Sequence, residues 1–155
     1  MFQLTRRNAI ALMVAAAGCG RRPAEATTQP PLYPGETPEM RALIRKYAVI
    51  HEIPESLLHR VIQRESDYRA HLRAGPYYGL MQVLPATARE MGFRGNPSEL
   101  LDAETNLLYA GRYLRGAWLV SGGDEAAAVK WYARGYYYEA KRLGLLEETG
   151  VGGKG

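Results

Sequence analysis

The chain has 155 residues, of which 46% are hydrophobic and 23% are charged, which fits one globular domain with extensions. Its formal net charge is +4, and it falls to +2 once Arg6 and Arg7 are set aside with a segment that we expect to be removed. This weak charge, without a basic stripe interleaved with aromatic residues, gives no reason to expect a nucleic-acid partner, but it suits an anionic polymer.

The first 18 residues predict an export signal. Arg6 and Arg7 precede an apolar run over residues 9–17, and small residues then lead to Cys19. Because the run is too short to span a bilayer as a helix, we interpret residues 1–18 as a signal peptide, with the Sec and twin-arginine routes both open. We therefore expect the protein to be exported, with a periplasmic location.

Cys19 is the only cysteine, so the chain cannot form an intramolecular disulfide. The stretch Ala16-Ala17-Gly18-Cys19 resembles a bacterial lipobox, with alanine where leucine is usual. The alternative is ordinary signal-peptidase cleavage, for example after Ala17. We expect lipidation of Cys19, which would anchor the protein to a membrane.

A proline-rich stretch without apolar periodicity follows the cysteine, so residues 19–36 are interpreted as an anchor and an extended linker. Folding signals begin with Thr37 as a helix N-cap and Pro38 in the first turn, and this helix should end near His51. The predicted domain covers residues 37–146.

Further helices are predicted where apolar residues recur at helical spacing, and turns where glycine clusters. The predicted helices cover residues 54–65, 85–91, 103–120, 125–133 and 136–143, with Asp102 and Asp124 as helix starts and a loop at residues 75–79. Since no segment alternates with period two, the fold class is all-α. Residues 147–155 are predicted to be a flexible tail.

Glu65 is the first candidate for chemistry. It follows Leu58 by seven residues and Val61 by four, so it lies on the apolar stripe near the end of its helix. Burial and the negative end of the helix dipole both raise the pKa of such a carboxyl, as a general acid requires. The alternative is a boundary glutamate paired with Arg64 or Arg69.

Several short motifs occur in a distinctive order: Glu65-Ser66, Gly79-Leu80-Met81-Gln82, Pro85-Ala86-Thr87-Ala88, Asp102 to Asn106 with Tyr113-Leu114, and Tyr132 to Gly135. In this order and spacing, the chain resembles the catalytic domain of the soluble-lytic-transglycosylase (SLT) family over about residues 40–140. The resemblance implies a lysozyme-like helical domain with a deep cleft, acting on the glycan strands of peptidoglycan.

The resemblance also implies roles for single residues. Glu65 would be the sole catalytic acid and base, Met81 and Gln82 would contact substrate, and the Tyr132 hydroxyl would support the catalytic carboxyl. For Met81 and Tyr132, packing in the core is the alternative.

Five more tyrosines lie near these motifs. Tyr77 and Tyr78 are expected either to stack on sugar rings of the substrate or to pack, whereas residues 136–138 are expected to pack. No metal site and no cofactor are expected, since the histidines lack acidic or cysteine companions at ligand spacing: His51, His59 and His71.

The chain departs from the family pattern in two places. The segment from Glu65 to Gly79 is one residue shorter than usual, and Ala74 stands near the serine that commonly contacts a substrate acetamido group. The later motif, usually Tyr-Asn-Ala-Gly, lacks its asparagine and reads Tyr132-Ala133-Arg134-Gly135. These departures concern substrate contacts and leave the acid in place.

The reaction that the resemblance implies is cleavage of the β-1,4 bond between N-acetylmuramic acid and N-acetylglucosamine, with formation of 1,6-anhydro-N-acetylmuramic acid. One alternative is a hydrolytic muramidase, in which Asp102 or Glu104 positions a water. A second is a non-catalytic peptidoglycan-binding scaffold for an envelope assembly.

Overall fold

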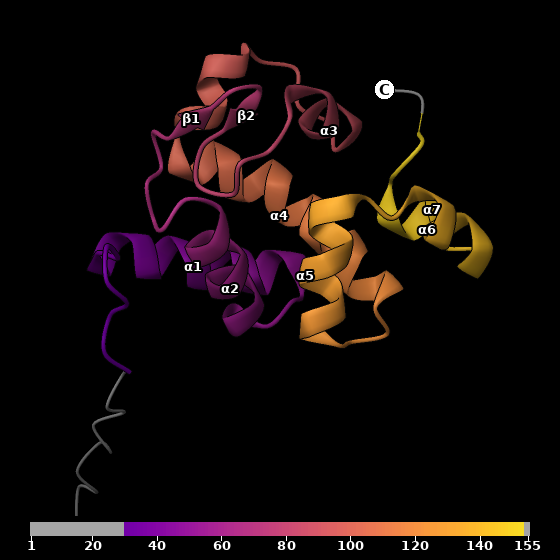
Figure 1. Ribbon diagram of the computed structural model, residues 1–155, viewed down its shortest axis with the longest axis horizontal. Helices are drawn as coiled ribbons and strands as arrows, with labels where there is room; N and C mark the ends of the chain where they lie inside the picture. Colours follow the sequence, from indigo (N-terminus) through magenta and orange to yellow (C-terminus); the bar gives the residue numbers. More distant parts are fainter. Residues whose placement is uncertain (1–29, 154–155) are drawn as a thin grey trace, which may run out of the picture. The chain divides into compact units, whose positions relative to one another are not determined.

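Helix α4 (Ala103–Val120) is the central element of the computed structural model, which describes residues 30–153. It contacts α1, α3, α5, α6 and α7, which surround it (Figure 1). As predicted, Asp102 caps this helix, and its carboxylate accepts a hydrogen bond of 2.8 Å from the backbone N–H of Thr105. Two glycines allow close packing, because a Cβ would lie 2.5 Å from the His51 ring at Gly111 and 2.2 Å from the Tyr136 hydroxyl at Gly116.

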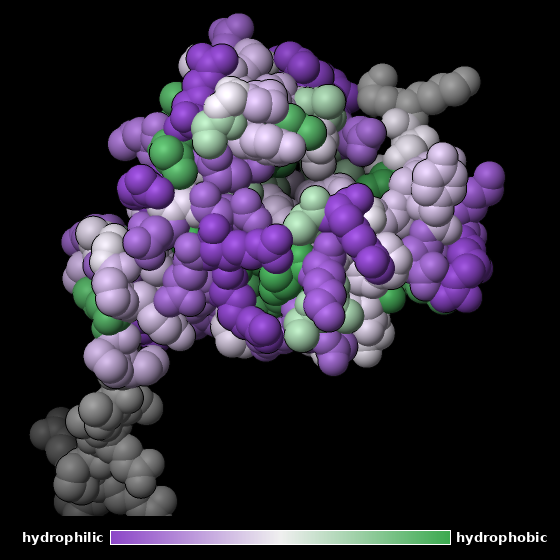
Figure 2. Space-filling model, viewed as in Figure 1, coloured by the Kyte–Doolittle hydropathy of each residue, from purple (hydrophilic) through white to green (hydrophobic). Residues whose placement is uncertain are grey.

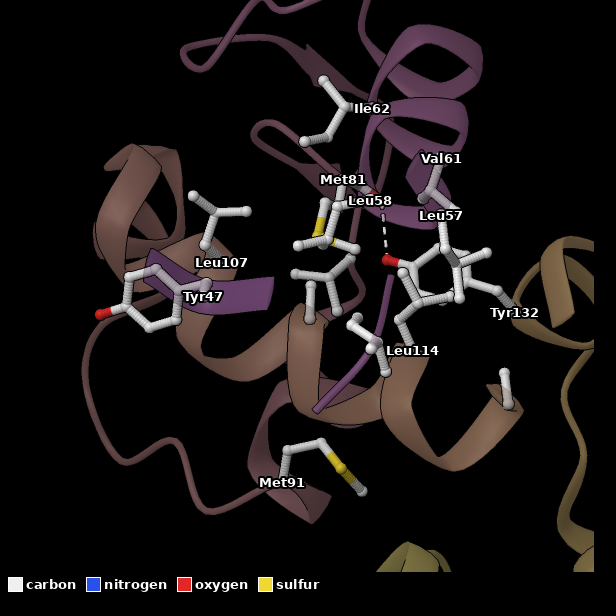
Figure 3. Packing of buried hydrophobic residues seen from close by; sticks show 14 of the residues in the cluster. Tyr47, Leu57, Leu58, Val61, Ile62, Met81, Met91, Leu107, Leu114 and Tyr132 are labelled. Carbon is white, nitrogen blue, oxygen red and sulfur yellow. Dashed lines mark hydrogen bonds between the residues drawn. The ribbon is translucent and has the colours of Figure 1, made fainter. Parts of the chain in front are cut away.

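Helices α1 (Pro38–His51) and α2 (Glu55–Glu65) agree closely with the predicted segments. The Thr37 hydroxyl caps α1 by accepting a hydrogen bond of 3.1 Å from the N–H of Met40. The apolar stripe of α2 faces the core, where four of its side chains are fully buried (Figure 3): Leu57, Leu58, Val61 and Ile62. This packing fixes the end of α2, where Glu65 lies.

The segment between α2 and α4 contains the only strands among the described residues. Strands β1 (Arg73–Ala74) and β2 (Tyr77–Tyr78) form an antiparallel hairpin, in which Arg73 pairs with Tyr78 and Ala74 with Tyr77. Helix α3 (Pro85–Glu90) and the 3-10 helix η1 (Pro97–Leu101) follow. The predicted loop at residues 75–79 thus contains the turn of this hairpin, at residues 75–76, and its second strand, which is too short to show an alternating pattern.

The C-terminal part of the domain consists of α5 (Glu125–Arg134), α6 (Tyr137–Leu143) and α7 (Leu146–Thr149). Thr149 and Val151 are buried, so the ordered domain extends beyond residue 146. The prediction of a tail from residue 147 was therefore wrong for residues 147–151, because a four-residue helix is too short to show apolar periodicity.

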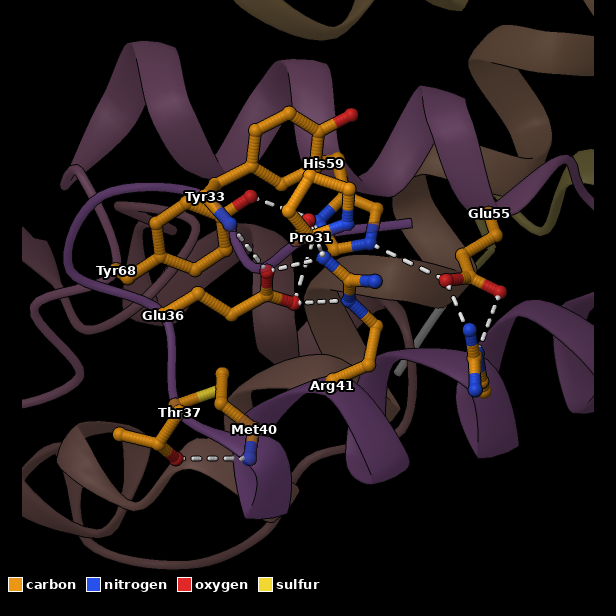
Figure 4. A network of polar contacts seen from close by, with 10 residues as sticks. Pro31, Tyr33, Glu36, Thr37, Met40, Arg41, Glu55, His59 and Tyr68 are labelled. Atoms are coloured by element: carbon orange, nitrogen blue, oxygen red, sulfur yellow. Dashed lines mark hydrogen bonds and ion pairs between the residues drawn. The ribbon is translucent and has the colours of Figure 1, made fainter. Parts of the chain in front are cut away.

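The N-terminal boundary also differs from the prediction, because residues 31–36 pack against the domain. The Glu36 carboxylate accepts two hydrogen bonds of 2.5 Å from the Arg41 guanidinium and one of 2.9 Å from the N–H of Tyr33 (Figure 4). His59 and the Tyr68 hydroxyl, 2.7 Å apart, complete this cluster, which is buried except for Tyr33. We call these five residues the Glu36 clamp. The linker prediction thus extended too far, since residues 31–36 belong to the folded domain.

Within residues 30–153, no helix has both the length and the apolar character needed to cross a membrane. The predicted signal peptide and Cys19 lie outside the described residues.

Candidate active site

Glu65 is the last residue of α2, and its side chain is 24% exposed. The next residue, Ser66, is buried and ends the helix, and its hydroxyl donates a hydrogen bond of 2.6 Å to the Leu80 carbonyl. This bond ties the end of α2 to the loop of residues 79–82. Ser66 therefore has a structural role, because its hydrogen bond holds the backbone beside Glu65 in place.

The loop of residues 79–82 is organised by Asn106, a fully buried residue of α4. Its side-chain oxygen accepts from the N–H of Met81 at 2.9 Å, and its amide group donates to the carbonyls of Tyr78 and Leu100 at 2.9 and 2.8 Å. Gly79 has a φ of 75°, and a Cβ there would lie 2.2 Å from the Leu100 carbonyl. Only glycine fits this position.

Gln82 adopts a left-handed backbone conformation with a φ of 49°, which is uncommon for a residue with a side chain. Its side-chain amide donates hydrogen bonds to the carbonyls of Leu72 and Gly79 at 3.0 and 2.9 Å. These bonds offset the backbone strain and hold the loop against the hairpin. The Gln82 side chain thus braces the loop as well as reaching the cavity described below.

Tyr132 enters the site from α5 and is buried. Its hydroxyl donates a hydrogen bond of 2.8 Å to the Met81 carbonyl (Figure 3). The proton of this hydroxyl is therefore directed to the loop and not to Glu65, which differs from the support expected for the catalytic carboxyl. Tyr132 remains close enough to Glu65 for the glutamate charge to raise the pKa of the tyrosine, after the larger effect of burial.

A cavity of about 620 Å³ opens beside Glu65, within the usual size of ligand sites. The space-filling view is hollowed between the part that carries the hairpin and helix α5 (Figure 2). Glu65 is the only carboxylic acid among the described residues that line the cavity. The wall is formed by Arg64, Glu65, Ala74, Tyr77, Gln82, Val83, Leu84, Thr87, Tyr113, Tyr132, Ala133, Arg134 and Gly135.

Burial raises the pKa of the Glu65 carboxyl, and the neighbouring Arg64 opposes this effect without cancelling it. The Arg64 Nε lies 3.5 Å from a Glu65 carboxylate oxygen, and the Arg64 side chain is 53% exposed. Burial likewise raises the pKa of Tyr113 to about 12, so this tyrosine is a neutral hydrogen-bonding group at the cavity wall near pH 7. A carboxyl with a raised pKa can deliver a proton to a leaving group at neutral pH.

The structure brings together three of the five residues predicted to bind substrate. Tyr77, Gln82 and Tyr132 line the cavity. Met81 does not: its side chain is fully buried in the core, and only its backbone carbonyl takes part in the site, through Tyr132. Tyr78 is half-buried, lies under the Arg73 guanidinium at 4.8 Å, and is not part of the cavity wall.

Several residues of the cavity wall were not assigned to the site from the sequence, among them Tyr113 and Arg134, and Arg64 was considered only as a partner of Glu65. Tyr113 and Arg134 both line the cavity, and Arg64 lines it in addition to pairing with Glu65. Arg134 stacks on the Trp131 ring at 3.7 Å. The position of Arg134, two residues after Tyr132 in the same motif, was the sequence signal that could have assigned it to the site. Ala74 and Ala133, the positions of the two departures from the family pattern, both face this cavity.

The two acids considered for a hydrolytic mechanism lie away from the cavity wall. Asp102 caps α4, and Glu104 is paired with Lys46 and accepts from the Tyr47 hydroxyl at 3.2 Å. Both are thus explained by helix capping and surface pairing. Within residues 30–153, no group of three or more His, Cys, Asp or Glu side chains is arranged to hold a metal ion.

Comparison with protein families gives a match to the family described as "Transglycosylase SLT domain", over residues 42–144. Comparisons with curated proteins and with solved structures give no significant match. The matched segment extends from α1 to the C-cap of α6 and contains Glu65, the loop of residues 79–82 and Tyr132. The chain therefore belongs to the transglycosylase SLT domain family, whose lysozyme-like members act on peptidoglycan.

Proposed function

We propose that this protein is a peptidoglycan lytic transglycosylase that cleaves the β-1,4 bond after N-acetylmuramic acid, with Glu65 as general acid and then general base. The observation that carries the proposal is the single carboxyl group in the cavity, whose pKa is raised by burial. Ordinary glycosidases need two carboxyl groups across the scissile bond. An intramolecular reaction needs only one.

The proposed reaction has two steps at the same side chain. Protonated Glu65 gives its proton to the glycosidic oxygen while the 2-acetamido group of the sugar stabilises the positive charge that develops at C1. Glu65, now ionised, then removes the proton of the C6 hydroxyl, which attacks C1. The product is a 1,6-anhydro sugar, and no water is consumed. Glu65 finishes protonated and ready for the next cycle.

The wall around Glu65 supports this order of events. The Tyr132 hydroxyl donates its hydrogen bond to the Met81 carbonyl, so it does not compete with Glu65 as an acid. The partial exposure of Glu65 leaves the carboxyl accessible from the cavity.

The test is mass analysis of the products that the protein and its Glu65→Gln variant release from purified sacculi. Anhydro-muropeptides, lighter than hydrolytic products by a molecule of water, are expected from the wild type. Glu65→Gln should lower the rate by at least about a thousandfold, since it removes both the acid and the base. Asp102→Ala is the matched control, because Asp102 is the alternative acid and lies outside the cavity.

Each other outcome has a distinct meaning. Products with reducing ends would establish hydrolysis and overturn the transglycosylase proposal, and loss of activity in Asp102→Ala would identify the water-positioning acid. Binding to sacculi without any release of products would establish a scaffold. Full activity of Glu65→Gln would exclude Glu65 as the catalytic acid.

We also propose that the protein is exported and anchored to a membrane through a lipid on Cys19, with a periplasmic location. The signal-like residues 1–18 and the lipobox-like Ala16 to Cys19 support this proposal. Metabolic labelling with a fatty acid should modify the wild type and leave Cys19→Ala unlabelled.

A further inference from the structure

Two arginines line the cavity that contains Glu65. Arg64 comes from the end of α2 and Arg134 from the end of α5, two helices that contact each other in the fold. Since Glu65 is the only acid in the described wall, the cavity carries an excess of positive charge whether or not that carboxyl is ionised. An anionic group on the substrate would therefore be attracted to the cavity.

The two arginines are held differently. The Arg134 guanidinium lies over the Trp131 ring, with its central carbon 3.7 Å from the ring centre, and this contact limits the orientations of the guanidinium. Arg64 is 53% exposed and contacts Glu65 through Nε at 3.5 Å, beyond the range of a good hydrogen bond. A loose, solvent-exposed pair of this kind is readily exchanged for a better partner.

A carboxylate on the substrate would be such a partner. A guanidinium binds a carboxylate through two parallel hydrogen bonds, which the present contact with Glu65 does not provide. Peptidoglycan carries carboxylates on the peptide stems attached to its muramic acid residues, next to the bond that is cleaved. A strand bound for cleavage at Glu65 would therefore bring such a carboxylate close to the bond that is cleaved.

We propose that Arg64, aided by Arg134, binds a carboxylate of the peptide stem, and that this exchange frees Glu65 from its arginine partner when substrate is in place. This inference rests on the proposed function. Arg64 is then a specificity-determining and positioning residue. It favours glycan strands with free stem carboxylates over strands whose carboxylates have been neutralised.

The exchange has a consequence for proton transfer. Arg64 is the cation that lowers the pKa of Glu65, against the larger effect of burial. The other charged or titratable groups at the cavity are Tyr113 from α4, Tyr132 and Arg134 from α5, and Tyr77 from β2. Removing Arg64 from Glu65 raises the pKa of the carboxyl further, so more of the acid is protonated at neutral pH.

The experiment compares two soluble substrates that differ only in charge: glycan strands with intact peptide stems, and the same strands after the carboxylates are converted to amides. The wild type should prefer the charged strands by roughly tenfold in kcat/KM, the size of one charge-assisted hydrogen bond. In Arg64→Gln, this preference should fall at least about threefold, and Arg64→Lys should retain part of it.

The pH profile supplies a readout that a structural role would not change. On amidated strands, Arg64→Gln should keep its activity to higher pH than the wild type, because Glu65 stays protonated to higher pH without its cation. Arg60→Gln is the control: Arg60 lies on the same helix, is similarly exposed, and pairs with Glu125 outside the cavity. It should behave as the wild type on both substrates.

The outcomes separate this inference from the proposed function. If the wild type forms anhydro products but Arg64→Gln shows an unchanged substrate preference, the inference is wrong and the proposed function stands. Equal effects of Arg60→Gln and Arg64→Gln would also overturn the inference, since they would reflect general surface charge. If the wild type cleaves neither substrate, the proposed function and this inference both fail.

Discussion

Glu36 is buried and Glu65 is partly buried, and their surroundings shift their pKa values in opposite directions. Burial raises the pKa of Glu36, but hydrogen bonds from Arg41 and from the Tyr33 backbone, with the nearby His59, outweigh it and hold the pKa below the ordinary value. Burial also raises the pKa of Glu65, and Arg64 only reduces the increase.

The difference lies in how the arginine meets the carboxyl. Arg41 is itself buried and forms two hydrogen bonds of 2.5 Å to Glu36, whereas Arg64 is mostly exposed and stays at 3.5 Å from Glu65. A buried, bidentate guanidinium fixes a carboxylate in its charged form. A solvent-exposed guanidinium that is held loosely leaves the carboxyl group able to gain and lose a proton. Only the second arrangement suits an acid that must titrate during a reaction.

The largest effect is expected when the Glu36 clamp is broken. Arg41→Met leaves the Glu36 carboxylate buried without its guanidinium, and this should lower the free energy of unfolding by about 3–5 kcal/mol. The measurement is chemical denaturation at neutral pH. In the double variant with Glu36→Gln, part of the stability should return, because no unpaired charge stays buried.

Arg45→Met is the matched control for this variant. Arg45 lies one helical turn further along α1 and pairs with Glu55 at 3.2 Å, with both side chains about one-third exposed. Its loss should cost less than about 1 kcal/mol, as for other surface pairs. Equal losses in the two variants would contradict the distinction between the buried and the exposed pair.

A smaller effect is expected at the loop beside Glu65. Asn106→Ala removes the hydrogen-bond partner of the Met81 N–H and of two carbonyls, so it should lower the free energy of unfolding by about 2–3 kcal/mol. It should also reduce the rate of glycan cleavage, since the loop carries Gln82 and receives the Tyr132 hydroxyl.

Asp102→Ala, on the same helix, separates these two consequences. It removes only the N-cap of α4, at a cost of about 1 kcal/mol, and should leave cleavage unchanged. If Asn106→Ala lost stability but cleaved at the wild-type rate, the loop would not be part of the functional site.

The parts of the fold that follow from local spacing were predictable. The partial burial of Glu65 followed from its place on the apolar stripe of α2. The caps formed by Thr37 and Asp102 were confirmed, because a cap depends on residues three positions apart. The all-α class was confirmed as well. The tail was misjudged because α7 is a single turn, whose apolar pattern is too short to detect.

Contacts between distant segments could not be predicted in the same way. Met81 was expected to contact substrate, but the direction of its side chain depends on how Asn106 holds the loop, 25 residues further along the chain. The Tyr132 hydroxyl donates its hydrogen bond to the carbonyl of Met81, which is 51 residues away in the sequence. The Glu36 clamp was missed because a proline-rich stretch gives no periodic signal that it packs against α1 and α2.

The smallest effect should also have the opposite sign: Glu65→Gln is expected to stabilise the protein at neutral pH. The pKa of folded Glu65 is raised above its ordinary 4.5, so its contribution to stability is present below that pH and is lost as pH rises through the folded value. Glutamine has no charge to bury. The free energy of unfolding of the variant, relative to that of the wild type, should therefore increase as pH rises from about 4 to about 8 in denaturation experiments.

Glu36 follows the reverse rule, because its folded pKa is lowered. The contribution of Glu36 to stability is present above pH 4.5 and is lost as pH falls through the pKa of Glu36 in the folded protein. Denaturation of the wild type and of Glu65→Gln across this range tests whether the two glutamates differ as described. A Glu65→Gln variant that is less stable than the wild type at neutral pH would mean that Arg64 stabilises ionised Glu65 more than burial opposes it. Glu65 would then resemble Glu36 and would be a poor general acid.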